Sequence, residues 1–263
     1  MDLAGRHIVV TGGASGIGRA CALRFADEDA KVTVSDLDLE GATATATEIH
    51  GHAIRADVGT QQDIEDLIAQ AEDRQGPIDA FFSNAGITGP PGGPPDLLDE
   101  DWDLLWRVNV MSHIWAARAL VPKMLERGEG YLLSTASAAG LLTQLGALGY
   151  ATTKHAAVAV AEWLDITYRD RGIRVSCLCP QFVNTPMVTE GLDVDKLRQI
   201  AQIIEPEQVA DEVVSAMNEE RFLILPHPEV AKYMATRGAT HDRWLAGMRK
   251  LQAQLGGLER PPQ

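Results

Sequence analysis

Short apolar runs alternate along the chain with longer stretches in which apolar side chains recur at helical spacing. The runs are typical of strands, because they are brief and are bounded by glycine, proline or polar residues. Strands that alternate with helices favour right-handed crossovers and a mostly parallel sheet covered by helices on both faces. No change in composition marks a boundary, so we expect one doubly wound α/β domain over residues 1–263 with a seven-stranded sheet. The runs span residues 7–10, 31–35, 53–55, 80–83, 130–134, 173–179 and 222–225.

The first run leads directly into a glycine-rich turn. Thr11–Gly18 follows Val10, and a segment with helical periodicity begins at Arg19. Glycines at this position let the backbone turn tightly, approach a pyrophosphate and pack the helix close to the sheet. The N–H groups and the dipole at the start of the helix can then hold phosphates. A turn that merely connects strand to helix is the alternative. The residues expected to bind a dinucleotide here are Gly12, Ser15, Gly16, Ile17 and Gly18.

An acidic residue ends the second run. Asp36 follows Ser35, and neither Arg nor Lys comes directly after it, since the next residues are Leu37 and Asp38. A carboxylate at that place can accept hydrogen bonds from both hydroxyls of an adenosine ribose and would repel a 2′-phosphate. The sequence therefore predicts NAD rather than NADP as the cofactor.

Tyr150 and Lys154 form a candidate proton-transfer pair. Residues four apart on a helix share a face, so the two side chains would lie one turn apart. The reference pKa of tyrosine is about 10. A nearby positive charge favours the phenolate by roughly 4 kcal/mol at an effective dielectric constant of about 20. Such a contribution would lower the tyrosine pKa by about 3 units, so we expect Lys154 to activate Tyr150 as an acid and base.

The glycine turn and the Tyr-x-x-x-Lys pair, with further motifs in the same order, resemble the short-chain dehydrogenase/reductase family. The resemblance extends to about Pro226 and implies a Rossmann-type fold with strand order 3-2-1-4-5-6-7. It implies that Ser137 and Tyr150 are catalytic, that Lys154 also binds the nicotinamide ribose, and that Asn109 helps to relay protons to solvent. Gln181 stands where the family usually has glycine. The remaining residues implied to contact the cofactor are Asp57 and Val58 at adenine, Asn84, Ala85 and Gly86 in the Asn-Ala-Gly turn, and Val183 and Thr185 at the carboxamide.

Simpler roles are available to several of these residues. The asparagines at positions 84 and 109 could tie loops together, and Thr185 before a proline could start a turn. Ser137 could be a packing residue, with Ser134 as the rival catalytic serine, and Asp57 could cap the helix expected over 61–74. Their common register with the glycine turn favours catalysis.

The implied activity is NAD-dependent interconversion of a secondary alcohol and a ketone. Tyr150 would take the hydroxyl proton while Ser137 holds the substrate oxygen. The alternatives are an NAD-dependent epimerase or dehydratase on the same fold, and a non-catalytic NAD-binding regulator. The complete set of four catalytic residue types argues against a regulator.

The segments expected to contact the substrate are mostly apolar. They comprise residues 141–148, 181–182 and 187–204, and they contain no arginine cluster to clamp a phosphate or carboxylate. We therefore expect a small, neutral and hydrophobic alcohol or ketone. A proline–glycine loop over 89–95 is either near the ligand edge of the sheet or an ordinary surface loop. A substrate loop over 186–205 and a helical tail over 227–263 complete the chain. The candidate substrate residues are Gln144, Gln181 and Met187.

Composition limits the other possibilities. A net charge of −14 argues against nucleic acid or an anionic membrane as a partner. The chain has three cysteines, Cys21, Cys177 and Cys179, and the last two alternate on an apolar run, which fits buried thiols in a reducing compartment. We expect neither a secretion signal nor a membrane-spanning segment, and therefore a cytoplasmic location. Histidine and cysteine spacings indicate no metal site. The alanine-rich helix beginning near Tyr150 favours a homodimer or homotetramer, as the family resemblance implies.

Overall fold

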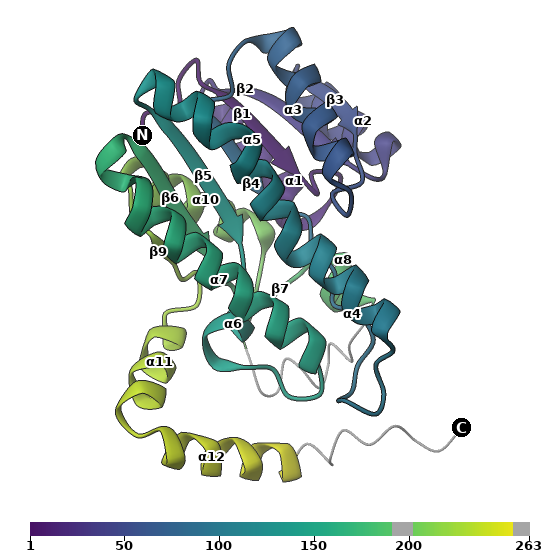
Figure 1. The fold of residues 1–263 in the computed structure, drawn as a ribbon, viewed down its shortest axis with the longest axis vertical. Coiled ribbons are helices and arrows are strands. Elements are labelled where there is room, and N and C mark those ends of the chain that lie inside the picture. The colour runs from purple at the N-terminus through teal and green to yellow at the C-terminus, as the bar shows by residue number, and fades with distance from the viewer. Residues whose placement is uncertain (191–201, 255–263) are drawn as a thin grey trace.

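The computed structural model describes residues 1–190 and 202–254, and its centre is a seven-stranded sheet (Figure 1). The strand order is β3-β2-β1-β4-β5-β6-β9, and every neighbouring pair is parallel. The predicted order is thereby confirmed, with β9 as the seventh strand. The strands are β1 (His7–Thr11), β2 (Lys31–Asp36), β3 (His52–Arg55), β4 (Ala80–Ser83), β5 (Gly130–Thr135), β6 (Ile173–Leu178) and β9 (Leu223–Ile224).

Two layers of helices cover the sheet because the strand side chains point alternately to its two faces. Val9 belongs to a core shared with α3, α5 and α7, whereas Ile8 and Val10 belong to a core shared with α1, α2 and α10. In Figure 1, α5 and α7 cross in front of the sheet and α1 and α10 lie behind it. The helices are α1 (Gly16–Asp27), α2 (Leu39–Glu48), α3 (Gln61–Gln75), α4 (Asp99–Trp106), α5 (Ser112–Arg127), α6 (Ala139–Leu142), α7 (Leu148–Tyr168), α8 (Pro186–Thr189), α10 (Pro206–Asn218), α11 (Glu229–Ala239) and α12 (His241–Gln254).

Three shorter elements were not expected. A π-helix, η1 (Arg107–Met111), joins α4 to α5, and a 3₁₀ turn, η2 (Arg169–Arg171), follows α7. A separate two-stranded parallel sheet pairs β7 (Phe182–Val183) with β8 (Ile203–Ile204). This small sheet joins the two ends of the predicted substrate loop over 186–205.

The C-terminal helices lie at one end of the molecule. Val230 is the buried residue of α11, whereas none of α12 is buried, and α12 packs mainly on α11. Within the described part of the chain, no helix is long and apolar enough to cross a membrane. Residues 191–201 of the predicted loop and 255–263 of the predicted tail lie outside the described residues. The division into one domain with this loop and tail stays a prediction.

Candidate active site

The glycine loop between β1 and α1 has a backbone that only glycine accommodates well. Gly12 and Gly16 have φ of +66° and +52°. A Cβ atom on Gly18 would lie 2.1 Å from the Gly12 carbonyl oxygen, and one on Gly12 would lie 2.9 Å from the Ala85 Cα atom. The loop thus lies close against the turn after β4, and a side chain at Gly12 or Gly18 would clash with backbone atoms.

Helix α1 begins beside this loop, with Ser15 as its N-cap residue and Ile17 in its first turn. Asp36, at the end of β2, lies next to it. One carboxylate oxygen of Asp36 accepts a hydrogen bond from the Ala14 N–H at 3.0 Å, and the other accepts from the Asp38 N–H at 3.1 Å. A carboxylate and a helix N-terminus therefore stand side by side, as an adenosine ribose and its phosphates require.

Asn84 ties three strand ends together. Its Nδ2 donates to the carbonyl oxygens of Thr11 and Gly12 at 3.0 and 3.3 Å, and its Oδ1 accepts from Thr135 Oγ1 at 3.0 Å. The Thr11 hydroxyl in turn accepts from the N–H groups of Asn84 and Ala85. The proposed loop-tying role of Asn84 is what the geometry displays, and this network fixes Ala85 and Gly86 beside the glycine loop.

Asp57 and Val58 follow β3. Val58 packs into the core, and the Asp57 carboxylate accepts from the Gly59 N–H at 2.8 Å. The N-cap of α3 is Thr60, whose hydroxyl accepts from the Asp63 N–H. The alternative in which Asp57 caps this helix is therefore wrong, because Asp57 instead shapes the turn that precedes it.

Ser137, Tyr150 and Lys154 come together at the carboxyl ends of β5 and β6. Ser137 is buried, and its hydroxyl accepts from the Ala139 N–H at 3.1 Å and reaches the Pro180 carbonyl oxygen at 3.5 Å. Lys154 Nζ lies 5.7 Å from the centre of the Tyr150 ring and donates to the Thr135 carbonyl oxygen at 2.9 Å. Ser134 is paired within the sheet as part of β5.

The pKa values of this cluster differ from the expectation. Burial raises the pKa of Tyr150, and a hydrogen bond with Ser137 opposes this increase. Burial also lowers the pKa of Lys154 to about 8. The predicted net lowering of the tyrosine pKa by Lys154 is therefore not found. The reason is that a buried site disfavours both the phenolate and the ammonium ion.

Asn109 lies in the π-helix η1 and is fully buried. Its Oδ1 accepts from the Ile87 N–H at 2.9 Å, and its Nδ2 donates to the Ile87 carbonyl at 2.9 Å and to Thr153 Oγ1 at 3.1 Å. These bonds fit the loop-tying alternative. A Cβ atom on Gly86 would nevertheless stand 3.1 Å from Asn109 Oδ1 and 3.2 Å from Lys154 Nζ, so the two side chains converge at this glycine.

The proline–glycine loop contacts the segment that leads into α7. Gly92 donates its N–H to the Gly146 carbonyl at 2.7 Å and accepts from the Leu148 N–H at 3.1 Å. Leu148 begins the helix that carries Tyr150. The proline–glycine loop, which follows β4 in the chain, therefore supports the start of this helix.

The segment after β6 contacts both the glycine loop and the C-terminal region. Val183 is buried in β7, and Thr185 touches Gly16, where an added Cβ would lie 2.9 Å from Thr185 Cγ2. The Gln181 N–H donates to Nδ1 of His227 at 3.2 Å. His227 was not predicted, although its position between two prolines after the last strand could have drawn attention to it. Of the candidate substrate residues, Gln144 and Gln181 are half-buried and Met187 is exposed.

His113 is a buried histidine near Lys154. Among the described residues, neither ring nitrogen of His113 has a hydrogen-bond partner, and burial followed by the charge of Lys154 lowers its pKa to about 3. No group of three or more His, Cys, Asp or Glu side chains in the described ranges could hold a metal ion. His113 is thus an isolated neutral group in the described part of the chain.

The residues present fit a dinucleotide. The glycine loop with its positive φ angles and the α1 N-terminus suit the pyrophosphate, and the Asp36 carboxylate suits the adenosine ribose. Ser137, Tyr150 and Lys154 lie at the same edge of the sheet, where ligands bind in open α/β folds.

Comparison with known proteins agrees with this geometry. A family model described as short chain dehydrogenase matches residues 6–194. The chain is 37% identical to a 1-deoxy-11-beta-hydroxypentalenate dehydrogenase of Streptomyces exfoliatus, over 87% of this chain and 86% of the relative. It is 30% identical to a cyclohexanol dehydrogenase of an Acinetobacter strain, over 82% and 89% of the two chains. A crystal structure of a short chain dehydrogenase/reductase from Burkholderia phymatum in complex with NAD superposes with a TM-score of 0.82 at 26% identity, and it covers 100% of this chain and 99% of its own.

Proposed function

Since the chain belongs to the short-chain dehydrogenase family and is an NAD-dependent oxidoreductase of secondary alcohols and ketones, we propose that Ser137, Tyr150 and Lys154 carry out its chemistry. The observation that carries this proposal is that these three side chains lie together in a site partly shielded from water. Lys154 Nζ stands 5.7 Å from the Tyr150 ring, and a hydrogen bond with Ser137 lowers the tyrosine pKa against the effect of burial.

In the oxidation direction, Tyr150 accepts the proton of the substrate hydroxyl group. Because burial raises its pKa, the Ser137 hydrogen bond and the nearby Lys154 charge must offset that rise for the phenolate to form. The C–H bond of the carbinol carbon breaks with its electron pair, and the O–H pair becomes the second bond of the carbonyl group. When bound, NAD supplies the hydride acceptor. Ser137 donates a hydrogen bond to the substrate oxygen and keeps it within reach of Tyr150. Lys154 places a positive charge near the phenolate. Asn109 holds the neighbouring backbone in position along the route by which the proton reaches solvent.

The segments that follow the carboxyl ends of the strands hold the cofactor. The glycine loop and the start of α1 bind the pyrophosphate, and Asp36 binds the adenosine ribose hydroxyls. Contacts between the loop, the Asn84 turn and Thr185 support this arrangement, since they bring segments from three parts of the chain together. Asp57 and Val58 complete the adenine side, and Val183 with Thr185 completes the carboxamide side.

The substrate is a hydrophobic, alicyclic secondary alcohol or the matching ketone. Leu141 and Leu142 follow Ser137, and both are apolar and buried. Relatives at 37% and 30% identity carry the names hydroxypentalenate and cyclohexanol dehydrogenase, which agrees with a cyclic alcohol. The polar contacts at the edge of this apolar surface come from Gln144 and Gln181, and Met187 adds a flexible apolar side chain.

The decisive experiment compares the wild type with Tyr150→Phe. NADH formation is followed with a series of cyclic and linear secondary alcohols, and NADH binding is measured separately by calorimetry. We expect cyclic alcohols to be oxidised best. The variant should bind NADH as the wild type does but lose turnover by about three orders of magnitude or more. Near-normal turnover by Tyr150→Phe would remove this residue from the acid–base role, and the absence of net NADH formation would point to another reaction on this fold.

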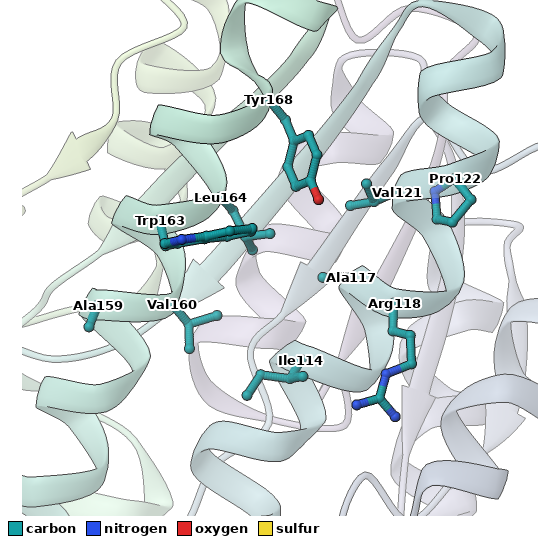
Figure 2. A pocket seen from close by; sticks show the side chains of 10 residues that line it. All are labelled: Ile114, Ala117, Arg118, Val121, Pro122, Ala159, Val160, Trp163, Leu164 and Tyr168. Carbon is teal, nitrogen blue, oxygen red and sulfur yellow. The ribbon is translucent and has the colours of Figure 1, made fainter.

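We further propose that two copies of the chain associate through α5 and α7. An apolar groove of about 560 Å³ runs between these helices, and Trp163, Ala159 and Ile114 contribute to its walls (Figure 2). Trp163 is 58% exposed and Ile166, farther along α7, is 84% exposed. Large exposed apolar side chains beside a groove favour an interface. A homodimer, or a homotetramer built from such dimers, would cover them.

A cytoplasmic location is part of the same proposal. Cys21, Cys177 and Cys179 are buried free thiols, which suits a reducing compartment.

A further inference from the structure

His227 is a buried histidine at the point where the cofactor segment meets the C-terminal region. It is 1% exposed and lies between β9 and α11. Its Nδ1 atom accepts the Gln181 N–H at 3.2 Å, and its carbonyl oxygen accepts the Val230 N–H at 3.1 Å in the first turn of α11. One residue therefore connects the segment after β6 to the start of the tail.

The same imidazole also lies beside both strands of the small sheet. The backbone groups of Phe182, in β7, and Gln202, next to β8, are close enough to influence its pKa. Phe182 pairs with Ile203, and Val183 pairs with Ile204. Within the part of the chain that the structure describes, Nε2 of His227 has no hydrogen-bond partner of good geometry. The ring thus lies beside the backbone at both ends of the predicted substrate loop.

The protonation state of His227 suits this contact. Burial lowers its pKa, and the carboxylate of Glu229 opposes the change. The imidazole is therefore neutral at physiological pH. A hydrogen bond from the Gln181 N–H to Nδ1 requires that Nδ1 carry no proton, so the proton of the neutral ring resides on Nε2.

We propose that His227 is a positioning residue that fixes the backbone of Gln181–Thr185, and with it Val183 and Thr185, for binding of the nicotinamide half of the cofactor. The inference rests on the proposed function, because those two residues are assigned to the cofactor there. Thr185 touches Gly16, so a displacement that begins at Gln181 reaches the glycine loop within a few residues. His227 itself stays outside the reacting atoms and acts through the Gln181 N–H.

The test uses three variants of the full chain. His227→Leu removes the acceptor and keeps an apolar side chain of similar size. His227→Asn keeps an acceptor oxygen close to the place of Nδ1. His7→Leu is the matched control, because His7 is also buried and hydrogen-bonded, to Gly76 and Thr33, but lies at the amino end of β1, away from the carboxyl ends of the strands. Each protein is assayed for NADH binding by calorimetry, for KM and kcat with NAD, and for thermal stability.

We expect His227→Leu to raise the Kd for NADH and the KM for NAD about tenfold, as loss of one buried hydrogen bond predicts, while kcat at saturating NAD changes less than about threefold. His227→Asn should restore the Kd to within about threefold of the wild type. His7→Leu should lower the melting temperature without changing the Kd. Unchanged NADH binding by His227→Leu, or equal weakening by the Leu and Asn variants, would overturn the inference. Failure of the wild type to bind NADH would instead reject the cofactor assignment on which it rests.

Discussion

Gly16 lies directly against Thr185, so closely that a Cβ atom on the glycine would stand 2.9 Å from Thr185 Cγ2. The two residues come from the first and the last part of the nucleotide-binding edge. The contact brings the glycine loop after β1 to the segment after β7. A substitution at either residue is therefore expected to weaken binding of both the adenosine half and the nicotinamide half of the cofactor.

Gly16→Ala should weaken NADH binding by at least about tenfold. The added methyl group meets Thr185, and φ of +52° at this position is unfavourable for alanine. Calorimetric titration with NADH measures the effect. Gly76→Ala is the control, since Gly76 also has a positive φ but a Cβ there would meet nothing within 4 Å. Equal NADH affinity in the two variants would contradict the assignment of Gly16.

Replacement of Asp36 should change cofactor preference. Asp36→Ala removes the carboxylate that would repel a 2′-phosphate, so the ratio of NADPH to NADH affinity should rise about tenfold or more. It also leaves the Ala14 N–H without its acceptor, so NADH binding itself should weaken. Asp38→Ala serves as the control because Asp38 caps α2 through the Glu40 and Gly41 N–H groups. The control should lower stability and leave the affinity ratio unchanged.

Lys154→Met should abolish oxidation but stabilise the fold at neutral pH. Burial lowers the pKa of Lys154 from 10.5 to about 8, so the ammonium ion costs the folded state up to about 3 kcal/mol below pH 8. Between pH 8 and 10.5 the unfolded chain binds more protons than the folded protein, so wild-type stability rises with pH.

The advantage of Lys154→Met is therefore largest near pH 7 and disappears towards pH 10.5. Loss of the bond from Lys154 to the Thr135 carbonyl offsets part of it, so we expect a melting temperature a few degrees higher at pH 7. Thermal unfolding across this pH range tests the prediction. A gain in stability that does not depend on pH would show that packing, rather than the buried charge, causes the difference.

Charge in the α5–α7 groove should separate the proposed dimer. Trp163→Glu combined with Ile166→Glu places carboxylates on the most exposed apolar part of α7. We expect sedimentation to change from an oligomer to a single-chain species, with the secondary structure unchanged by circular dichroism. Leu39→Glu, at an exposed position on α2, is the control and should keep the wild-type species. A single-chain species in the wild type would reject the proposed interface.

The sequence predicted the main sheet well because each strand has a clear local pattern. Alternate side chains of β1, such as Val9 and Val10, enter different cores, and the helices that follow provide the layer for each face. Once the strands alternate with helices, handedness and short connections leave few possible orders. The glycine loop and Asp36 were found in the same way, since both follow directly from strand ends.

Other features depend on contacts that no local pattern reveals. The π-helix around Asn109 contains one extra residue per turn, which apolar spacing does not reveal. β7 and β8 have two residues each and come from distant segments. The Tyr150 pKa depends on burial by several elements, which a pairwise estimate with Lys154 omits. The role of His227 depends on its hydrogen bond with the Gln181 N–H, which no local sequence pattern predicts.

The hydrogen bonds between Gly92 and the segment before α7 use backbone atoms alone. Gly92 itself is constrained, because its φ is +124° and a Cβ would stand 2.6 Å from the Asp96 side chain. The prolines on either side of it make no such demand. Evolution can therefore exchange the side chains of this loop while the backbone support of the α7 start is inherited unchanged. A library that randomises residues 90, 91, 94 and 95 and retains Gly92 should keep the hydrogen bonds that hold the start of α7.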